Sequence, residues 1–179
     1  LFFKKNIKTS PLIEIKQLNL QKLINIKVNR IQVGSDRIAN AIGMIDNKKN
    51  YIIIDFGTAT TFDVVVKKNY LGGVIAPGVN LSLQNLTLRA SLIPSIQLTK
   101  ISNVIGTNTS KAVKSGFYWG YIGLIDNIIY LIKKETRKSF NIIITGGFSK
   151  LFKNSIKTKV KQDIDITING LIKASKLIK

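Results

Sequence analysis

The fold is decided by residues 51–63, which read Tyr51-Ile52-Ile53-Ile54-Asp55-Phe56-Gly57-Thr58-Ala59-Thr60-Thr61-Phe62-Asp63. The first part is an aliphatic, β-branched run that ends in a carboxylate, which is the pattern of a buried strand. Phe56-Gly57-Thr58 turns the chain, and residues 60–66 are a second β-rich run. Lys67-Lys68-Asn69 then makes a hairpin turn into a third run at 70–75. The order predicts a meander of three strands.

Helical and strand patterns alternate after this meander. Thr107 and Asn108 are cap-type residues, so a long helix is expected from about residue 108, with Ala112, Phe117, Tyr121, Leu124, Ile125, Ile128 and Leu131 on its apolar face. This order is α/β and suits the ribonuclease H-like fold. The other expected elements are one or two strands within 1–30, a strand at 141–144 and a weak strand near 95–98. Helices are expected at about 38–42, after Gly78 to about Ala90, briefly after 147, and from about 169 to 179.

The composition limits the possible chemistry. The chain has 179 residues, of which 45% are hydrophobic, and it contains neither Cys nor His. This excludes a disulfide framework, a Cys/His zinc site, a thiol nucleophile and imidazole catalysis. Any proton transfer must therefore use Asp, Glu, Lys or Tyr.

The net charge of +19 is compatible with two interpretations. Such a charge is typical of proteins that bind nucleic acid or an anionic membrane. However, 24 of the 28 basic residues are Lys, whereas specific readers of nucleic acid favour Arg. We favour a lysine-coated surface, and no specific nucleic-acid partner is expected. The most apolar stretch, 121–132, is too short to cross a bilayer, and no signal peptide is visible, so we expect a cytoplasmic protein without a membrane partner.

Two Gly/Thr turns follow buried strands. At 55–58, a carboxylate and backbone N–H groups could hold a cation and a phosphate, although an ordinary β-turn would look the same. Thr145-Gly146-Gly147 follows the strand at 141–144 and would let a flat ligand approach the backbone, although a tight strand-to-helix turn is the simpler interpretation. Together the two turns resemble the two sides of a nucleotide cleft.

Three further segments carry candidate functional groups. Gly34-Ser35-Asp36-Arg37 opens a helix, where Asp36 could deprotonate a hydroxyl and Arg37 could hold a carboxylate. A helix cap with a surface ion pair is the alternative. Residues 72–78 are rich in Gly, which suggests close packing of the backbone. Residues 105–109 could bind a ligand or simply cap the long helix.

In this order, these segments resemble the type III pantothenate kinases, which belong to the actin/hexokinase/Hsp70-like ATPase superfamily. The resemblance runs from about residue 20 to the end of the chain. It implies ATP-dependent phosphorylation of pantothenate, the first step of coenzyme A synthesis. It also implies a ribonuclease H-like (actin-like ATPase) fold, a homodimer, Mg²⁺ with the ATP, and a monovalent cation, K⁺ or NH₄⁺. The matching segments are 34–37, 55–63, 71–78, 105–109, 115–116, 145–147 and 166–171.

The resemblance also implies roles for individual residues. Asp36 would be the general base, and Asp55 would bind the monovalent cation. The others would bind substrates: Gly34, Ser35, Arg37 and Thr109 would bind pantothenate, Thr109 across the dimer interface, while Gly57, Thr58, Gly146 and Gly147 would bind ATP.

The sequence also departs from the family. Members begin with a strand and a turn that cradle the β- and γ-phosphates and help to hold Mg²⁺, and no such segment precedes Gly34. We therefore expect that the chain starts about 60–80 residues late, given a typical domain size, and that it is inactive alone. Residues 1–48 would end a first ribonuclease H-like domain and 49–179 would form the second. The family's aromatic residue near Lys27 and its Pro near Arg30 are also absent.

Other functions remain open at the sequence level. The first alternative is a nucleotide-binding or regulatory relative without catalysis, although such a protein needs no base at Asp36. The second is a superfamily kinase for a sugar or acetate, against which Gly34-Ser35-Asp36-Arg37 argues. The third is a nucleic-acid-binding module, but the aromatic residues of 117–121 lie in a helix with few charges, where core or dimer interface is the simpler assignment.

Overall fold

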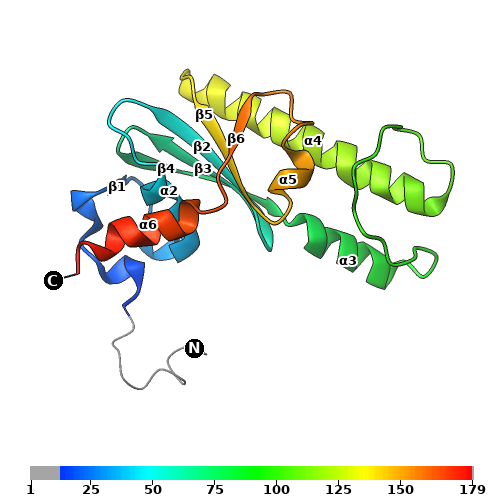
Figure 1. Cartoon of the computed structure of the whole chain (residues 1–179), viewed down its shortest axis with the longest axis horizontal. Helices are drawn as coiled ribbons and strands as arrows, with labels where there is room; N and C mark the ends of the chain where they lie inside the picture. Colours follow the sequence, from blue (N-terminus) through cyan, green and yellow to red (C-terminus); the bar gives the residue numbers. More distant parts are fainter. Residues whose placement is uncertain (1–12, 179) are drawn as a thin grey trace.

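The computed structural model describes residues 13–178, which form one six-stranded sheet with helices on both faces (Figure 1). The strand order is β1-β4-β3-β2-β5-β6. Strand β3 pairs antiparallel with β2 on one side and with β4 on the other. The remaining pairs are parallel: β1 with β4, β5 with β2, and β6 with β5. The strands are β1 (Asn25–Ile26), β2 (Asn50–Phe56), β3 (Ala59–Val66), β4 (Asn69–Pro77), β5 (Asn141–Gly146) and β6 (Val160–Gln162).

The helices divide between the two faces of the sheet. Helices α2 and α6 pack side by side on one face, and the long helix α4 crosses the other (Figure 1). Helix α3 and the first half of α4 extend beyond the sheet. The bounds are α2 (Ser35–Gly43), α3 (Val79–Arg89), α4 (Thr109–Thr136), α5 (Ser149–Phe152) and α6 (Ile166–Ser175), with 3₁₀ turns η1 (Ile15–Gln17), η2 (Leu20–Lys22) and η3 (Arg30–Gln32).

The alternation of side chains along β2 and β3 creates two cores of different character. Ile52, Ile54 and Phe62 face α4 in an apolar core. Residues that pair across strands share a face of the sheet, and Asp55 pairs with Thr61 on β3 and with Thr145 on β5. These polar groups therefore lie together on the face that carries α2, at the end of β2. This arrangement positions the candidate site.

Most of the predicted elements are confirmed. The three-strand meander, the turn at 67–69, the strand at 141–144 and the helix that begins at Ser35 all form. Residues 13–30 contain only the short strand β1 between 3₁₀ turns, and the expected elements before residue 13 lie outside the described residues. The strand expected near 95–98 does not form, and strand β6 was not anticipated.

The apolar face predicted for α4 is confirmed in part, because Phe117, Tyr121, Leu124, Ile125 and Ile128 belong to the core or pack against it. Of the seven residues expected to face the core, only Ile125 is fully buried, and Leu131 is 47% exposed. The helix is apolar on almost every side from residue 117 to 132, so the sequence period does not reveal which side faces the sheet. The buried positions follow a spacing of three and four residues: Ser115, Tyr118, Ile122, Ile125, Ile129 and Ile132.

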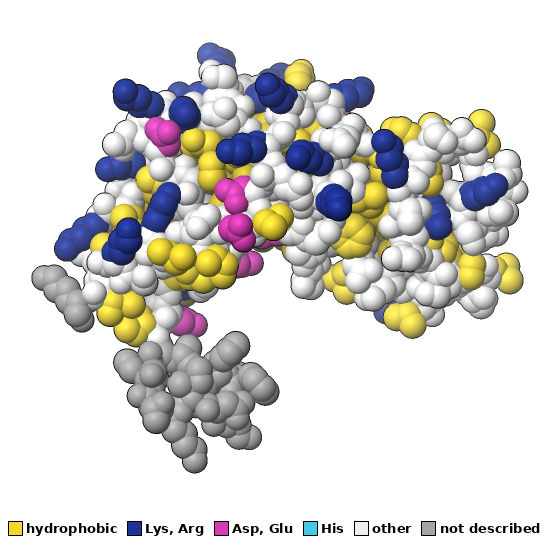
Figure 2. All heavy atoms as spheres, viewed as in Figure 1, with side chains coloured by type: hydrophobic (Ala, Val, Ile, Leu, Met, Phe, Trp, Pro, Cys, Tyr) yellow, Lys and Arg dark blue, Asp and Glu magenta, His cyan; other side chains and the backbone are white. Residues whose placement is uncertain are grey.

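The surface is coated with basic side chains. Figure 2 shows Lys and Arg spread over this face of the molecule rather than gathered in one patch. No helix between residues 13 and 178 has both the length and the apolar character that crossing a bilayer requires.

Candidate functional site

Carboxylates from two different elements meet at a cavity of about 590 Å³ at the end of β2, which we call the carboxylate pocket. Asp36 reaches it from the first turn of α2, and Asp55 from the end of β2. Its wall residues are Asp36, Asp55, Gly57, Thr58, Ala59, Thr61, Ile75, Ala76, Pro77, Gly78 and Leu81. The structure therefore brings together four of the residues predicted from sequence, Asp36, Asp55, Gly57 and Thr58.

Asp36 is placed to act on a ligand in this pocket. It is an exposed residue, and its Oδ1 atom accepts a hydrogen bond from the backbone N–H of Arg37 at 2.8 Å. Gly34 is the residue before α2, and Ser35 is the first residue of the helix. The helix therefore presents the Asp36 carboxylate at its N-terminal end, where the backbone dipole favours negative charge.

Asp55 is held by a chain of hydrogen bonds that reaches the last helix. Its Oδ2 atom accepts a hydrogen bond from Asn40 at 3.0 Å, and the Asn40 Oδ1 atom accepts one from Thr167 on α6 at 2.6 Å. Burial raises the pKa of the Asp55 carboxyl, as does the nearby charge of Asp36, while the hydrogen bond from Asn40 opposes them. A nearby cation would relieve this cost of burying the charged form.

The donor set fits a small cation. Thr61 lies opposite Asp55 in the pocket wall, and its hydroxyl oxygen is buried without a hydrogen-bond partner. A carboxylate and a hydroxyl oxygen are oxygen ligands of the kind that hard cations prefer. Within residues 13–178 no group of three or more His, Cys, Asp or Glu side chains gathers. A cation at Asp55 would therefore take its other ligands from hydroxyl, backbone or substrate oxygens.

Arg37 does not line the carboxylate pocket and is instead engaged by Asp63. The Nη2 atom of Arg37 lies 2.7 Å from Oδ1 of Asp63, and Nε donates a hydrogen bond to the same oxygen at 2.7 Å. The Tyr70 hydroxyl donates a third contact to Oδ1, also at 2.7 Å. Sequence reasoning assigned no role to Asp63 or Tyr70. The available signal was a charged residue, Asp63, inside an otherwise apolar and Thr-rich strand.

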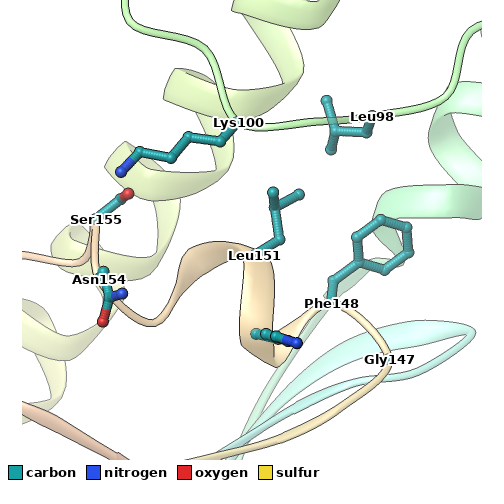
Figure 3. Close-up of a pocket in the computed structure, with 8 residues that line it drawn as sticks. Leu98, Lys100, Gly147, Phe148, Leu151, Asn154 and Ser155 are labelled. Carbon is teal, nitrogen blue, oxygen red and sulfur yellow. The ribbon is translucent and has the colours of Figure 1, made fainter.

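Gly146 lies beside Asp55, and the next residue, Gly147, lines a second cavity. Gly146 has a φ of +82°, and a Cβ atom at this position would lie 2.6 Å from Oδ1 of Asp55. Gly147 lines a cavity of about 440 Å³ (Figure 3). In that cavity Leu98, Leu151 and Phe148 point toward one another, and Lys100 lies at the rim near Ser155. Apolar side chains together with two lysines, Lys100 and Lys150, could hold a flat base and an anionic group.

Thr109 is not brought to this site within one chain. It is the first residue of α4, and it is absent from the walls of the carboxylate pocket. Figure 1 shows the beginning of α4 at the opposite end of the molecule from α2. Asn108 caps the helix by accepting a hydrogen bond from the N–H of Lys111 at 2.9 Å, as its residue type predicted.

Comparison with known proteins decides the family. The family model described as type III pantothenate kinase matches residues 2–130. A protein of Pelagibacter ubique with this name is 66% identical over 179 residues, which are 100% of this chain and 72% of that protein. Relatives of the same name from Cereibacter sphaeroides (strain ATCC 17025) and Jannaschia sp. are 46% and 47% identical over 78% of this chain. The chain belongs to the type III pantothenate kinase family.

The chain does not span the full length of these kinases. It matches 55% of the Cereibacter type III pantothenate kinase and 54% of the Jannaschia type III pantothenate kinase.

Solved structures show the fold that this pantothenate kinase family member adopts. A Campylobacter jejuni protein described as a Baf family transcriptional activator superposes with a TM-score of 0.64 at 20% identity, over 88% of this chain and 70% of that one. The Alp12 filament structure gives a TM-score of 0.53 at 15% identity, over 78% of this chain and 52% of that one. The predicted actin-like ATPase fold is confirmed.

The Asn40 link between α6 and Asp55 gives a stability prediction. Asn40→Ala leaves the Asp55 carboxylate without its amide donor and the Thr167 hydroxyl without its acceptor. We expect the free energy of unfolding to fall by about 1–3 kcal/mol, because buried polar groups lose their partners. Thr167→Val removes only the outer hydrogen bond and should cost less. Urea denaturation of both variants measures the difference. An equal loss of unfolding free energy in the two variants would contradict the chain of hydrogen bonds from Thr167 through Asn40 to Asp55.

The buried position of Asp63 gives a pH prediction. Burial raises the pKa of the Asp63 carboxyl to about 6, from 3.8, and Arg37 offsets only part of this effect. Between about pH 4 and pH 6, the folded protein holds a proton that the unfolded chain has released. The stability that this group contributes is therefore present at low pH and is lost as the pH rises through 6. Thermal melts from pH 4 to 7 should show this decline in wild type relative to Asp63→Asn, and parallel curves would contradict it.

Proposed function

We propose that the protein transfers the γ-phosphoryl group of ATP to pantothenate, the first step of coenzyme A synthesis. The observation that carries the proposal is the carboxylate pocket, in which Asp36 faces Asp55 and the Gly57-Thr58 turn, in a chain of the type III pantothenate kinase family. Phosphoryl transfer depends on positioning and charge neutralisation more than on covalent catalysis. Carboxylates, hydroxyls and backbone N–H groups can provide both without His or Cys.

In this mechanism Asp36 is the general base. It accepts the proton of the primary hydroxyl of pantothenate, whose oxygen forms a bond to the γ-phosphorus while the bond to the bridging oxygen of ADP breaks. Gly34 and Ser35, next to Asp36, contact pantothenate, as does Arg37. The Gly57-Thr58 turn presents its backbone N–H groups and the Thr58 hydroxyl to the phosphates. The cavity lined by Gly147 receives the adenosine. Gly146, the residue before it, also contacts the nucleotide.

Two kinds of cation belong to the proposal. Mg²⁺, entering with ATP, would neutralise charge on the phosphate oxygens. A monovalent cation, K⁺ or NH₄⁺, would be held by Asp55 and the unpartnered hydroxyl of Thr61. The cytoplasmic location and the division into two ribonuclease H-like domains near residue 48 stay predictions. In the structure, α2 packs against α6 and β1 pairs with β4, so residues on both sides of position 48 share one sheet.

The product distinguishes this function from nucleotide binding alone. We expect ³¹P NMR of the protein, expressed from its complete reading frame, with ATP, Mg²⁺, K⁺ and pantothenate, to show a new phosphomonoester on the primary hydroxyl. A regulatory relative that only binds nucleotide would shift the ATP resonances and form no phosphoester. Acetate and a hexose serve as controls for other kinases of the superfamily, and phosphorylation of either in place of pantothenate would refute the substrate assignment.

A homodimer is also part of the proposal. Helix α3 and the loop that follows it expose large apolar side chains on the lobe that extends beyond the sheet (Figure 2). Leu88 is 82% exposed and Leu92 88% exposed, and Ile105, near the start of α4, is 85% exposed. A second copy of this chain could cover them and would bring a partner's Thr109 toward the site. Apolar surface of this kind is typical of interfaces between subunits.

The dimer gives a mutational prediction. The double variant Leu88→Glu with Leu92→Glu should shift the protein from dimer to monomer in sedimentation velocity, because each carboxylate would be buried without a partner. Turnover should fall with the dimer fraction if Thr109 acts across the interface. Ile164→Glu is the matched control, since Ile164 is 70% exposed but lies between β6 and α6. A dimer that survives the double variant would refute this interface.

A further inference from the structure

Asp63 is a buried carboxylate whose partners all converge on one oxygen. It lies in the middle of β3, opposite Ile53 on β2 and Gly73 on β4, and its side chain is 0% exposed. Its Oδ1 atom receives the ion pair and hydrogen bond from Arg37 and the hydrogen bond from Tyr70, while Oδ2 has no hydrogen-bond partner. This buried group is not used by the phosphoryl transfer described above.

The cost of this arrangement indicates a role beyond packing. Burying a charge pair costs several kcal/mol per ion, and replacing such a pair by well-packed apolar side chains is often neutral or stabilising. The sheet also leaves space for the guanidinium. A Cβ atom on Gly73 would lie 2.9 Å from Nη2 of Arg37 and would collide with the carbonyl of Phe62. Asp63, Tyr70 and Gly73, from two strands, therefore accommodate a single side chain.

That side chain is the immediate neighbour of Asp36. Arg37 projects from the first turn of α2 to the sheet, and its backbone N–H donates to the Asp36 carboxylate at 2.8 Å. Three residues later on the same helix, Asn40 binds Asp55. Residues three apart lie on one face of a helix, so α2 is attached to two neighbouring strands by two partly buried polar contacts. The first of these fixes the turn that carries Asp36.

We propose that Asp63 and Tyr70 are positioning residues, which fix the first turn of α2 through the Arg37 guanidinium and so hold the Asp36 carboxylate at the carboxylate pocket. The inference rests on the proposed function for the role of Asp36. It also changes the expectation for Arg37. Its charge is already balanced by Asp63, so the guanidinium acts as an anchor for the helix and not as a free cation. Five N–H donors allow it to serve as an anchor while still donating to a ligand.

The kinetic test compares Asp63→Asn and Tyr70→Phe with wild type. Asp63→Asn removes the negative charge that pairs with Arg37, and Tyr70→Phe removes the hydroxyl that donates to Oδ1. Both substitutions change the shape of the side chain little. We expect kcat to fall about 10- to 100-fold for Asp63→Asn, because a small misplacement of a catalytic group has an effect of this size, and less for Tyr70→Phe. The KM for ATP should stay near the wild-type value. In an Arg37→Met background, Asp63→Asn should reduce kcat no further, since both act through one contact.

Val64→Ala is the matched structural control. Val64 is the next residue on β3, is also buried, and faces the opposite core. Its truncation should lower the melting temperature and leave kcat per folded molecule unchanged. If Asp63→Asn and Tyr70→Phe behave like Val64→Ala, with kcat within about twofold of wild type, Asp63 only stabilises the fold and the proposal is wrong.

A second readout does not need activity. Amide hydrogen exchange of residues 35–38 should be at least about tenfold faster in Asp63→Asn and Tyr70→Phe than in wild type, and unchanged in Val64→Ala. If wild type is inactive but shows this exchange pattern, the proposed kinase function is wrong, and the proposal that Asp63 and Tyr70 fix the first turn of α2 stands. Unchanged exchange in both variants would show that Asp63 and Tyr70 do not fix the first turn of α2, whatever the kinase activity. If Asp63→Asn does not fold, Tyr70→Phe gives the same two readouts.

Discussion

Asp36→Asn is expected to lower turnover by about 10²-fold or more while the fold survives. The substitution removes the only proton acceptor that α2 presents to the carboxylate pocket. The fold should survive because Asp36 is exposed and Asn retains an oxygen that can accept the hydrogen bond from the N–H of Arg37. Steady-state kinetics with saturating ATP and pantothenate measure the loss, and circular dichroism checks the fold.

A matched control separates loss of the base from loss of a negative charge. Asp165→Asn makes the same chemical change at the start of another helix, α6, on the same face of the sheet but outside the described pocket walls. Its turnover should match wild type. Turnover of Asp36→Asn within about threefold of wild type would exclude Asp36 as the general base.

Gly146→Ala is expected to lower the free energy of unfolding more than Asn40→Ala does. The residue has a φ of +82°, which side chains rarely adopt, and the added Cβ would lie 2.6 Å from Oδ1 of Asp55 and 2.7 Å from the backbone of Phe56. Strain of this kind costs about 1–3 kcal/mol, and the contacts add to it. Because the Cβ would also displace the Asp55 carboxylate, dependence of activity on K⁺ should weaken together with stability.

The control is the same substitution where space is free. Gly123 lies in the exposed interior of α4, and an added Cβ there would have nothing within 4 Å. Gly123→Ala should stabilise the protein by about 0.5–1 kcal/mol, since Ala is the better helix former. Chemical denaturation of the pair measures both effects. A Gly146→Ala variant as stable as wild type would show that Gly146 does not require its left-handed backbone conformation.

The sequence predicted those parts of the fold in which local pattern and tertiary role agree. The aliphatic run before Asp55 and the Gly/Thr turns marked the strands and their ends, and the structure brings Asp36, Asp55, Gly57 and Thr58 to one pocket. Strand β6 gave no comparable signal. It has only three residues, Val160–Gln162, and an edge strand that pairs on one side with β5 needs no apolar run.

The contact of Arg37 with Asp63 could not be predicted because the two residues are distant in the sequence. Arg37 and Asp63 are 26 positions apart, and only the register of β3 against β2 and β4 shows that Asp63 faces α2. The same holds for Thr167 and Asn40, which are 127 positions apart. The fully buried positions of α4 were missed for a different reason, because an almost uniformly apolar helix has no clear period that separates buried from half-buried positions.

Formation of ADP with and without pantothenate is the most direct test of the proposed kinase activity. The protein, expressed from its complete reading frame, would be supplied with ATP, Mg²⁺ and K⁺, and ADP would be followed by a coupled assay. We expect ADP release that saturates with pantothenate and falls to the background rate when pantothenate is omitted. ATP binding without ADP release at any pantothenate concentration would contradict it and would identify a nucleotide-binding relative of the kinases.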